Sequence, residues 1–586
     1  MSRLRGALGA YAADARAALS AAPVEVGLGV LVAVCLSVSL REGAFSEDDF
    51  VRVGASAALA FPLVLALSVL RVRGVVSPMV RWAGTGAVLA LCAAFGAVWL
   101  DTDRSADGWR WFLLTIAAVL ALLLTPALPW RTRDRRMVWS FAARLVARVT
   151  GIVLYAGALY ALLAGAVAAV VSLFELRGPQ HLYGDLAGAV FFALAPLILV
   201  GGIHRLAAPP EPGVPAAVAV LGRWLYAPAL VVYLAILYAY GLKVVVSGEL
   251  PRNLLSPLVI AAGLIGLVGA YLLHPVHESA EHRGLALLTR LVPALLIPLV
   301  PLALWGLGAR LGEYGWTEFR YIRLALAVAI GVLAVLGTVR LARRRPPLLA
   351  TIPAVLAAAL LLAAVGPWSA PAVSKRDQTA RLRAALAEAG VDPGALPADT
   401  VTVDSAAYAR IEGSARYLVR AHGIGALQAV VPAAPDSTRD VWGMGGMLGL
   451  RRSCGPAERA FATIDWSGGV AGVAGGTVTE VQVASQQVEA GGVRLRLDAD
   501  RVTAEAEGWR AAGSLAPLLA GFEPDDACEG PRRGAGTRFS AADARVELRD
   551  AEGAVRAQLV VTRIGVEGGA AAEVGGLLVV PTRSTP

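Results

Sequence analysis

The stretch TGIVLYAGALYALLAGAVAAVVSLF, residues 150–174, decides the fold class, because it contains no charged side chain. About 20 mostly apolar residues are needed for a helix to cross a bilayer, since unpaired backbone groups cannot be left in lipid. Similar stretches lie on both sides of this one, and together they predict an α-helical polytopic membrane bundle of about eleven transmembrane helices. The predicted spans are Val24–Leu40, Val53–Leu70, Trp82–Leu100, Trp111–Leu128, Thr150–Phe174, Leu186–Ile203, Trp224–Tyr240, Leu254–Leu273, Leu285–Leu307, Ile322–Val339 and Leu348–Trp368.

Composition divides the chain into a membrane part and a second, more polar part. The 586 residues are 57% hydrophobic and 17% charged, but the apolar excess ends near Trp368. We predict a cytoplasmic N-terminal amphipathic segment (1–20), a transmembrane helical domain (21–368) and an extracytoplasmic α+β domain (369–586). The net charge is +9, and Ser374 onward carries 23 Lys and Arg against 26 Asp and Glu, so the membrane part is strongly basic. Basic residues in short loops indicate contact with lipid rather than nucleic acid.

Loop charges predict the orientation of the helices, because loops rich in Lys and Arg stay in the cytoplasm. The first and third loops are acidic (Glu42, Glu47, Asp48 and Asp49; Asp101, Asp103 and Asp107). The second, the fourth and the loop before the last span are basic (Arg71, Arg73 and Arg81; Arg131, Arg133, Arg135, Arg136, Arg144 and Arg148; Arg340, Arg343, Arg344 and Arg345). This alternation predicts a cytoplasmic N-terminus and, for an odd number of spans, an extracytoplasmic C-terminal domain.

The C-terminal domain reads as helices followed by strands. Ser374 is a candidate N-cap with Asp377 as its capping-box partner, and Gly390 ends the helix that follows. A second helix is predicted over residues 405–422. Beyond Thr463 the apolar residues alternate, as in residues 493–497, 546–548 and 555–559, and residues 550–553 are a candidate hairpin turn. Residues 576–581 form the last predicted strand.

Three histidines lie close together in the segment HPVHESAEH, residues 274–282. On a helix, one face would carry His274, His277, Glu278, Glu281 and His282. Of these, His274, His277, Glu278 and His282 are the candidate ligands of a metal ion, and pH sensing is a second possibility for the cluster. The spacing is one residue longer than HExxH, and a solvated loop is the alternative interpretation. The sequence predicts no cofactor.

A second polar cluster stands at the head of the tenth span, in YGWTEFRY, residues 314–321. Its candidate members are Arg310, Glu313, Tyr314, Glu318, Arg320 and Tyr321. Charged groups this close to lipid tend to pair, so the cluster either fixes two helices through ion pairs or contacts a substrate or ion.

Few other groups suggest chemistry. Glu25 lies at the end of a span, and the seventh span carries several tyrosines that either line a polar cavity or pack in the core. Ion-driven transporters usually place an ionisable residue near mid-membrane, and none is seen in these spans. Cys454 and Cys528 are a candidate disulfide of the extracytoplasmic domain.

Three features resemble bacterial multipass membrane proteins of domain-of-unknown-function family 4153. These are the multipass region, the segment 314–321, and the junction after the last span with Ser374, Gln378, Arg381 and Leu382, followed by residues 410–418. The resemblance extends to about Pro432. It implies the architecture and a location in the bacterial plasma (inner) membrane, and no particular activity, because the family has no agreed activity.

Three functions remain open. The favoured one is a non-enzymatic envelope protein whose external domain binds a partner, since no catalytic motif accompanies a sizeable external domain. The alternatives are a transporter or channel for a small solute, and a membrane enzyme acting on lipid-linked substrates. The bilayer is an expected partner, and another envelope protein is a candidate.

Overall fold

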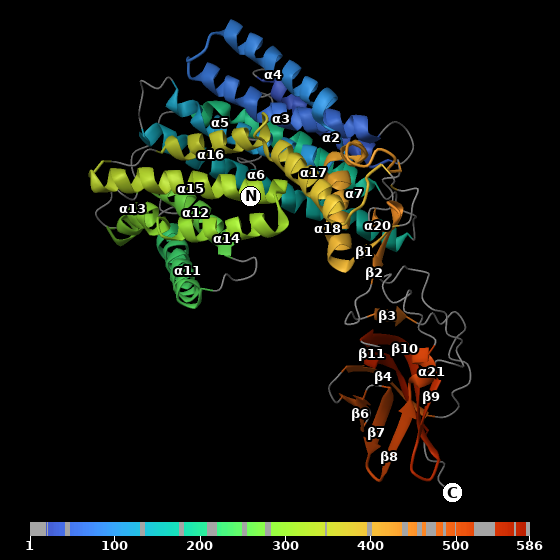
Figure 1. The fold of residues 1–586 in the computed structure, drawn as a ribbon. Helices are drawn as coiled ribbons and strands as arrows, with labels where there is room; N and C mark the ends of the chain where they lie inside the picture. The colour runs from blue at the N-terminus through green and yellow to red at the C-terminus, as the bar shows by residue number, and fades with distance from the viewer. Residues whose placement is uncertain are drawn as a thin grey trace. The chain divides into compact units, whose positions relative to one another are not determined.

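The computed structural model describes most of the chain (Figure 1). The described residues are 19, 22–41, 47–128, 135–174, 181–207, 220–248, 255–275, 283–345, 349–394, 396, 401–435, 444–453, 460–463, 476–484, 488–490, 492–498, 500–520, 545–567 and 570–581. The predicted N-terminal amphipathic segment lies almost wholly outside them. The chain forms two compact units, a membrane unit of residues 1–381 with 417–426, and a second unit of residues 382–416 with 427–586.

Helices build the membrane unit, as the apolar stretches predict. Its elements are α2 (Pro23–Ser39), α3 (Glu47–Val72), α4 (Pro78–Trp99), α5 (Ser105–Leu124), η1 (Thr125–Ala127), α6 (Arg135–Leu173), α7 (Leu182–Ala187), η2 (Gly188–Leu194), α8 (Ala195–Gly201), α9 (Ile203–Ala207), η3 (Gly222–Tyr226), α11 (Ala227–Ser247), α12 (Leu255–Leu272), α13 (Arg283–Leu296), α14 (Leu299–Tyr314), α15 (Glu318–Ala342) and α16 (Thr351–Ala364). Within the described residues, nine helical segments are long and apolar enough to cross a membrane. Two shorter apolar helices, α2 and α16, coincide with the first and last predicted spans. The protein is therefore a polytopic membrane protein.

Hydrophobic packing groups these helices into two sets. One cluster joins α2, α3, α4 and α5, and another joins α11 to α16. Helix α5 links the two sets, because Leu113 and Ala117 pack against Ile322 of α15 and Leu360 of α16. Trp109 of α5 also contacts the ring of Phe319, with 5.8 Å between the ring centroids. The N-terminal ends of α5 and α15 therefore lie side by side.

The stretch that decides the fold belongs to a helix longer than predicted. Helix α6 begins at Arg135, so four arginines assigned to the fourth loop are helical. Residues 135–149 contain neither glycine nor proline, and nothing in them interrupts a helix. Trp139 packs in this extension and donates from Nε1 to the Leu272 carbonyl at 2.7 Å.

The sixth and seventh spans each contain a π-helical segment that is followed by a proline. Proline has no N–H, and its ring crowds the carbonyl four residues earlier. Pro196 follows η2, and Pro228 follows η3, so the crowded carbonyls belong to Phe192 and Trp224 within the π segments. At Gly29 of α2, a Cβ atom would lie 2.6 Å from the Phe192 oxygen. Only glycine lets α2 approach the widened turn this closely.

The tyrosines of the seventh span hold helices together. Tyr226 of η3 and Tyr233 of α11 donate to carbonyls of α12, those of Gly266 at 3.0 Å and Leu258 at 2.9 Å. Tyr238 donates to the Leu295 carbonyl of α13 at 2.7 Å. Of the two interpretations of these tyrosines, packing with bonded hydroxyls fits the contacts.

Two helices pass between the units, α17 (Ala370–Glu388) and α18 (Ser405–His422). The predicted N-cap at Ser374 is wrong, because α17 begins at Ala370 and Ser374 lies buried inside the helix, where its hydroxyl is bonded to other groups. The predicted ends are confirmed, since Gly390 and Gly423 adopt φ values of 67° and 78°, which suit glycine after a helix. A short helix follows, α19 (Ile424–Gln428).

Strands dominate the second unit, as predicted. They are β1 (Val401–Asp404), β2 (Leu450–Ser453), β3 (Ala460–Thr463), β4 (Gly476–Ala484), β5 (Val488–Ala490), β6 (Val493–Asp498), β7 (Arg501–Ala506), β8 (Trp509–Ser514), β9 (Arg545–Arg549), β10 (Val555–Glu567) and β11 (Ala570–Pro581), with short helices α20 (Met444–Met447) and α21 (Ala516–Ala520). Strands β1 and β2 pair in parallel. The others form a sheet in the order β4-β11-β10-β9-β8-β7-β6-β5, with β3 on β10.

Alternation gives this sheet one buried face, as the period-two pattern predicts. Val493, Leu495 and Leu497 of β6 are buried with side chains from β7 to β11 and α21. The predicted hairpin turn is confirmed, because Gly553 donates to the Asp550 carbonyl between antiparallel β9 and β10. The exposed face carries charges of alternating sign, since Arg494 pairs in register with Glu489 on β5 and Glu505 on β7. Such cross-strand pairs stabilise a solvated face.

Candidate functional site

The turn between α14 and α15 is built on one glycine. Gly315 has φ 72° and ψ −175°, a conformation that only glycine adopts readily. Thr317 then caps α15, accepting with its side-chain oxygen from the Arg320 amide at 3.4 Å. This local geometry places Glu318 in the first helical turn, where a carboxylate is favoured by the helix dipole.

Three polar side chains of α17 bind this turn. Asp377 accepts from the Trp316 amide at 2.8 Å and from Arg381 Nε at 3.0 Å. Gln378 donates to the Trp316 carbonyl at 3.1 Å, and Arg381 donates to the Leu311 carbonyl at 3.1 Å. The guanidinium thus supplies a positive group to the C-terminal end of α14, where helix carbonyls lack partners. Segment 314–321 and the junction residues that carry the family resemblance are therefore one structural site.

Glu318 is the centre of a buried polar cluster, which we call the junction cluster and define as Glu318, Ser374, Tyr417 and His422. Ser374 donates to Glu318 Oε1 at 2.6 Å, and His422 Nε2 lies 3.3 Å from the same oxygen. Tyr417 donates its hydroxyl to Glu318 Oε2. One carboxylate therefore joins α15 to both α17 and α18, and both of its oxygens have partners.

Burial increases the free-energy cost of losing any of these hydrogen bonds. Glu318 is 3% exposed and Ser374 is 0% exposed. A buried carboxylate is tolerated when donors surround it, and removing a partner leaves the desolvation penalty uncompensated. Burial, and then the charge and hydrogen bond of Glu318, raise the pKa of Tyr417 above the ordinary value of 10.0. Tyr417 is thus held as a neutral donor.

The cluster contains the side chains of a hydrolytic triad in an arrangement that does not suit catalysis. A serine nucleophile must give its proton to a histidine that a carboxylate orients. Here Ser374 donates to the carboxylate, while His422 Nε2 lies 3.3 Å from both Ser374 Oγ and Glu318 Oε1. The burial of Ser374 also leaves its hydroxyl no exposed surface on which a substrate could sit. The geometry is that of a structural junction.

The other predicted members of the polar cluster lie on the same turn with different partners. Arg310 and Glu313 form an ion pair of 3.6 Å. The guanidinium groups of Arg310 and Arg320 lie over the Tyr314 ring, 5.6 and 5.4 Å from its centroid. Tyr321 contacts the ring of Trp316. Glu318 is therefore bound by Ser374, Tyr417 and His422, whereas Arg310 and Arg320 contact other groups near the turn.

A second carboxylate, that of Glu25 near the start of α2, is also buried. It is 0% exposed, and its Oε1 accepts from Ser68 of α3 and lies 3.5 Å from Arg81 Nη2 of α4. Its Oε2 has no hydrogen-bond partner in the part of the chain that the structure describes. Glu25 thus joins three helices with one of its two oxygens.

The candidate metal and disulfide sites fall largely beyond the described residues. His274 is buried just after α12, whereas His277, Glu278 and His282 lie outside the described ranges. Among the residues that are described, no group of three or more His, Cys, Asp or Glu could hold a metal ion. Cys454 and Cys528 are likewise outside, so the disulfide stays a prediction.

Sequence reasoning missed two members of the junction cluster, Tyr417 and His422. Both lie about a hundred residues after Glu318, on a helix that was assigned to the second domain. The apolar stripe of that helix was predictable and is buried, but the stripe does not show which polar residues meet a carboxylate. The resemblance included residues 410–418 and therefore Tyr417, but it did not include His422.

A family comparison covers both segment 314–321 and the junction residues from Ser374 to Leu382. The model of the family described as domain of unknown function (DUF4153) matches residues 28–399, which is more than half of the chain, and the protein belongs to this family. The match contains α14, α15 and α17 but ends before α18. No significant match was found among curated proteins. None was found among solved structures either.

Proposed function

We propose that the protein is a non-enzymatic membrane protein whose bundle holds residues 382–586 outside the cytoplasm, where they bind another envelope protein. The junction cluster carries this proposal. Helices α17 and α18 are the segments by which the chain leaves the membrane unit and returns to it, and both are bonded to Glu318. A scaffold that presents a domain needs such a fixed base.

Two further observations support presentation over transport or catalysis. The hydroxyls of Tyr226, Tyr233 and Tyr238 are bonded to carbonyls of neighbouring helices, which is a packing role. Both oxygens of Glu318 are likewise bonded to protein groups, whereas a substrate site keeps polar groups free to bind its ligand.

Photocrosslinking in living cells tests partner binding. A photoreactive amino acid would replace Arg496, Glu505 or Arg549, which are exposed on the solvated face of the sheet, and Val98 of α4 as the control in the membrane unit. We expect discrete adducts of higher mass at one or more sheet positions, absent at Val98. Irradiation that yields no adduct at any of the three sheet positions would contradict the proposal.

Thiol labelling of intact cells tests the location. With Cys454 and Cys528 replaced by Ser, a Glu505→Cys variant should react with a membrane-impermeant maleimide without permeabilisation. An Arg340→Cys variant, at the end of α15, is the matched control and should react only after permeabilisation. The opposite pattern would place the second unit in the cytoplasm.

Reconstitution separates the rival functions. Uptake of a small solute into proteoliposomes that disappears in Glu318→Ala, with the variant still folded, would favour a transporter. We expect no such uptake from wild type or variant.

A further inference from the structure

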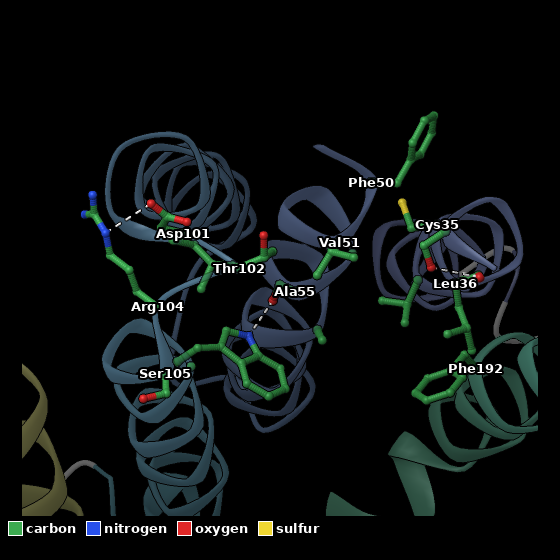
Figure 2. Close-up of a pocket in the computed structure, with 17 residues that line it drawn as sticks. Cys35, Leu36, Phe50, Val51, Ala55, Asp101, Thr102, Arg104, Ser105 and Phe192 are labelled. Carbon is green, nitrogen blue, oxygen red and sulfur yellow. Dashed lines mark hydrogen bonds and ion pairs between the residues drawn. The ribbon is translucent and has the colours of Figure 1, made fainter. Parts of the chain in front are cut away.

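A pocket opens at the end of the membrane unit where α2 ends and α3 and α5 begin. Its volume is about 460 Å³, within the range of sites that bind small molecules. Figure 2 shows Asp101, Thr102 and Arg104 on one side and Leu36 and Phe192 on the other. The pocket is distinct from the junction cluster.

The inner wall of the pocket is apolar. It is formed by Val32 and Leu36 of α2, Val51, Ala55 and Ala58 of α3, and Phe192 of η2. From Val51 to Ala58 the wall follows about 10 Å of helix. Two alanines on this face of α3 leave the space that larger side chains would fill. Trp111 also lines the pocket, and its only donor, Nε1, is used by the Ala55 carbonyl at 2.8 Å. The wall therefore suits a hydrocarbon chain.

The rim of the pocket is polar and carries both signs of charge. Arg104 Nε lies 3.1 Å from Asp101 Oδ2, and the Arg104 side chain is 48% exposed. Thr102 donates its hydroxyl to Asp48, a second carboxylate beside the rim. Ser105 opens α5, so the positive end of a long helix dipole faces the same place. The rim offers a guanidinium and a helix N-terminus for a phosphate, and carboxylates for an ammonium group.

From this arrangement we infer that the pocket binds one acyl chain of a zwitterionic phospholipid of the phosphatidylethanolamine class. The chain lies along Val51, Ala55 and Ala58, the phosphate faces Arg104 and Ser105, and the ammonium faces Asp101. The site stands at the ends of membrane helices, where a bilayer changes from hydrocarbon to headgroups. The surrounding membrane supplies the ligand.

Charge complementarity selects this lipid over an anionic one. Among the described residues, Asp101 at the rim and Asp48 beside it outnumber Arg104, so a phosphate without an ammonium would meet uncompensated carboxylates. Arg104 also borders the junction, because a Cβ atom at Gly423, just after α18, would lie 3.0 Å from Arg104 Nε. The bound headgroup would thus sit beside the helix through which the chain returns to the bundle.

Native mass spectrometry of the delipidated full-length protein in detergent tests this inference. Phosphatidylethanolamine and phosphatidylglycerol with the same acyl chains would be titrated separately. We expect one saturable phosphatidylethanolamine adduct and weaker binding of phosphatidylglycerol. An Ala58→Trp variant fills the pocket and should weaken the first adduct at least tenfold, which corresponds to about 1.4 kcal/mol. Ala94→Trp, on an exposed face of α4, is the control and should bind as wild type.

Two further measurements keep the inference open to disproof. If Ala58→Trp fails to fold, the milder Ala55→Leu replaces it, and a phosphatidylethanolamine with a photoreactive acyl chain should label residues 51–58 in the wild type. Asp101→Asn should reduce the preference for phosphatidylethanolamine over phosphatidylglycerol. Equal binding of both lipids by the wild type, unchanged binding by the filled-pocket variant, or labelling elsewhere would each overturn the inference.

Discussion

Two glutamates are buried near the ends of membrane helices, and they differ in how completely they are bonded. Glu318 is bonded at both oxygens by Ser374, Tyr417 and His422. Glu25 is bonded at one oxygen by Ser68 and Arg81, and its other oxygen has no partner within the described ranges. Replacing Glu318 disturbs hydrogen bonds at both carboxylate oxygens, whereas replacing Glu25 disturbs contacts at one oxygen only. The contrast predicts that substitutions at Glu318 reduce stability more than substitutions at Glu25.

Removing the fully bonded carboxylate should have the largest effect. Glu318→Ala removes the buried acceptor shared by Ser374, Tyr417 and His422, and we expect the free energy of unfolding to fall by about 3 kcal/mol. Thermal unfolding of the detergent-solubilised protein, followed by fluorescence-detected size exclusion, measures the loss. Glu313→Ala is the control, because Glu313 is largely exposed and is paired with Arg310. Equal stability of the two variants would show that the junction cluster contributes nothing.

The turn that positions Glu318 should be nearly as sensitive. Gly315→Ala forces a side chain into a conformation reserved for glycine, with its Cβ 2.3 Å from Arg381 Nε and 2.4 Å from Asp377 Oδ2. We expect a loss of about 2 kcal/mol in the same unfolding assay. Gly312→Ala, three residues earlier in α14, has open space around its Cβ and should be neutral or slightly stabilising. A neutral Gly315→Ala would refute this account of the turn.

Removing one donor should cost less than removing the acceptor. Tyr417→Phe removes the hydroxyl that donates to Glu318 Oε2. That oxygen then loses this hydrogen bond and resembles Oε2 of Glu25, which has no partner among the described residues. We expect a loss of about 1.5 kcal/mol at neutral pH, in the range of hydrogen bonds to charged groups. Differential unfolding of wild type and variant gives the value. A more stable variant would mean that the hydrogen bond of the hydroxyl is weaker than the desolvation cost of burying it.

The contribution of Tyr417 should depend on pH in one direction. Its pKa is raised in the folded state, so the folded protein holds the phenolic proton more tightly than the unfolded chain does. The stabilisation is complete below the unfolded pKa, near 10, and is lost as the pH rises toward the folded value. The stability difference between wild type and Tyr417→Phe should therefore stay constant from pH 7 to 9 and shrink above pH 10. A difference that grows with alkalinity would be inconsistent with a neutral donor.

The smallest effect is expected at the partly bonded carboxylate. In Glu25→Gln the amide oxygen can still accept from Ser68, and the amide nitrogen replaces the oxygen that lacks a partner. The amide nitrogen finds no acceptor among the described residues, and the attraction to Arg81 is weakened, so we expect a loss of about 1 kcal/mol, the smallest of the series. Unfolding of Glu25→Gln beside Glu318→Gln makes the comparison direct. A larger loss at Glu25 would reverse it.

Hydrophobicity made the membrane unit predictable, whereas the junction depended on tertiary contacts. The predicted spans were recovered as helices because an apolar stretch of sufficient length has few alternatives in lipid. The strands of residues 493–497 and 546–548 were predictable for a similar reason, since alternation alone gives them a buried face. Glu318 could be selected from its position, but its partners are 56 to 104 residues away in sequence. No local pattern links such distant positions.

The wrong N-cap at Ser374 shows the same limit at a single residue. Serine followed three residues later by an acidic residue is a sound local signal for a helix start. In the fold, Ser374 is inside α17 and its hydroxyl binds Glu318 and the Pro371 carbonyl, while Asp377 binds the turn before α15. Both side chains were selected correctly as hydrogen-bonding groups. Their partners came from another helix, which the local signal does not contain.

The return of residues 417–426 to the membrane unit has a consequence for biosynthesis. A ribosome makes Glu318 and Ser374 well before Tyr417 and His422, so the nascent bundle carries a half-bonded carboxylate until the chain has been made to residue 422. A protein shortened at residue 399, where the family match ends, would keep that defect permanently. The membrane unit can therefore be completed only after residues 382–416 of the second unit have been made.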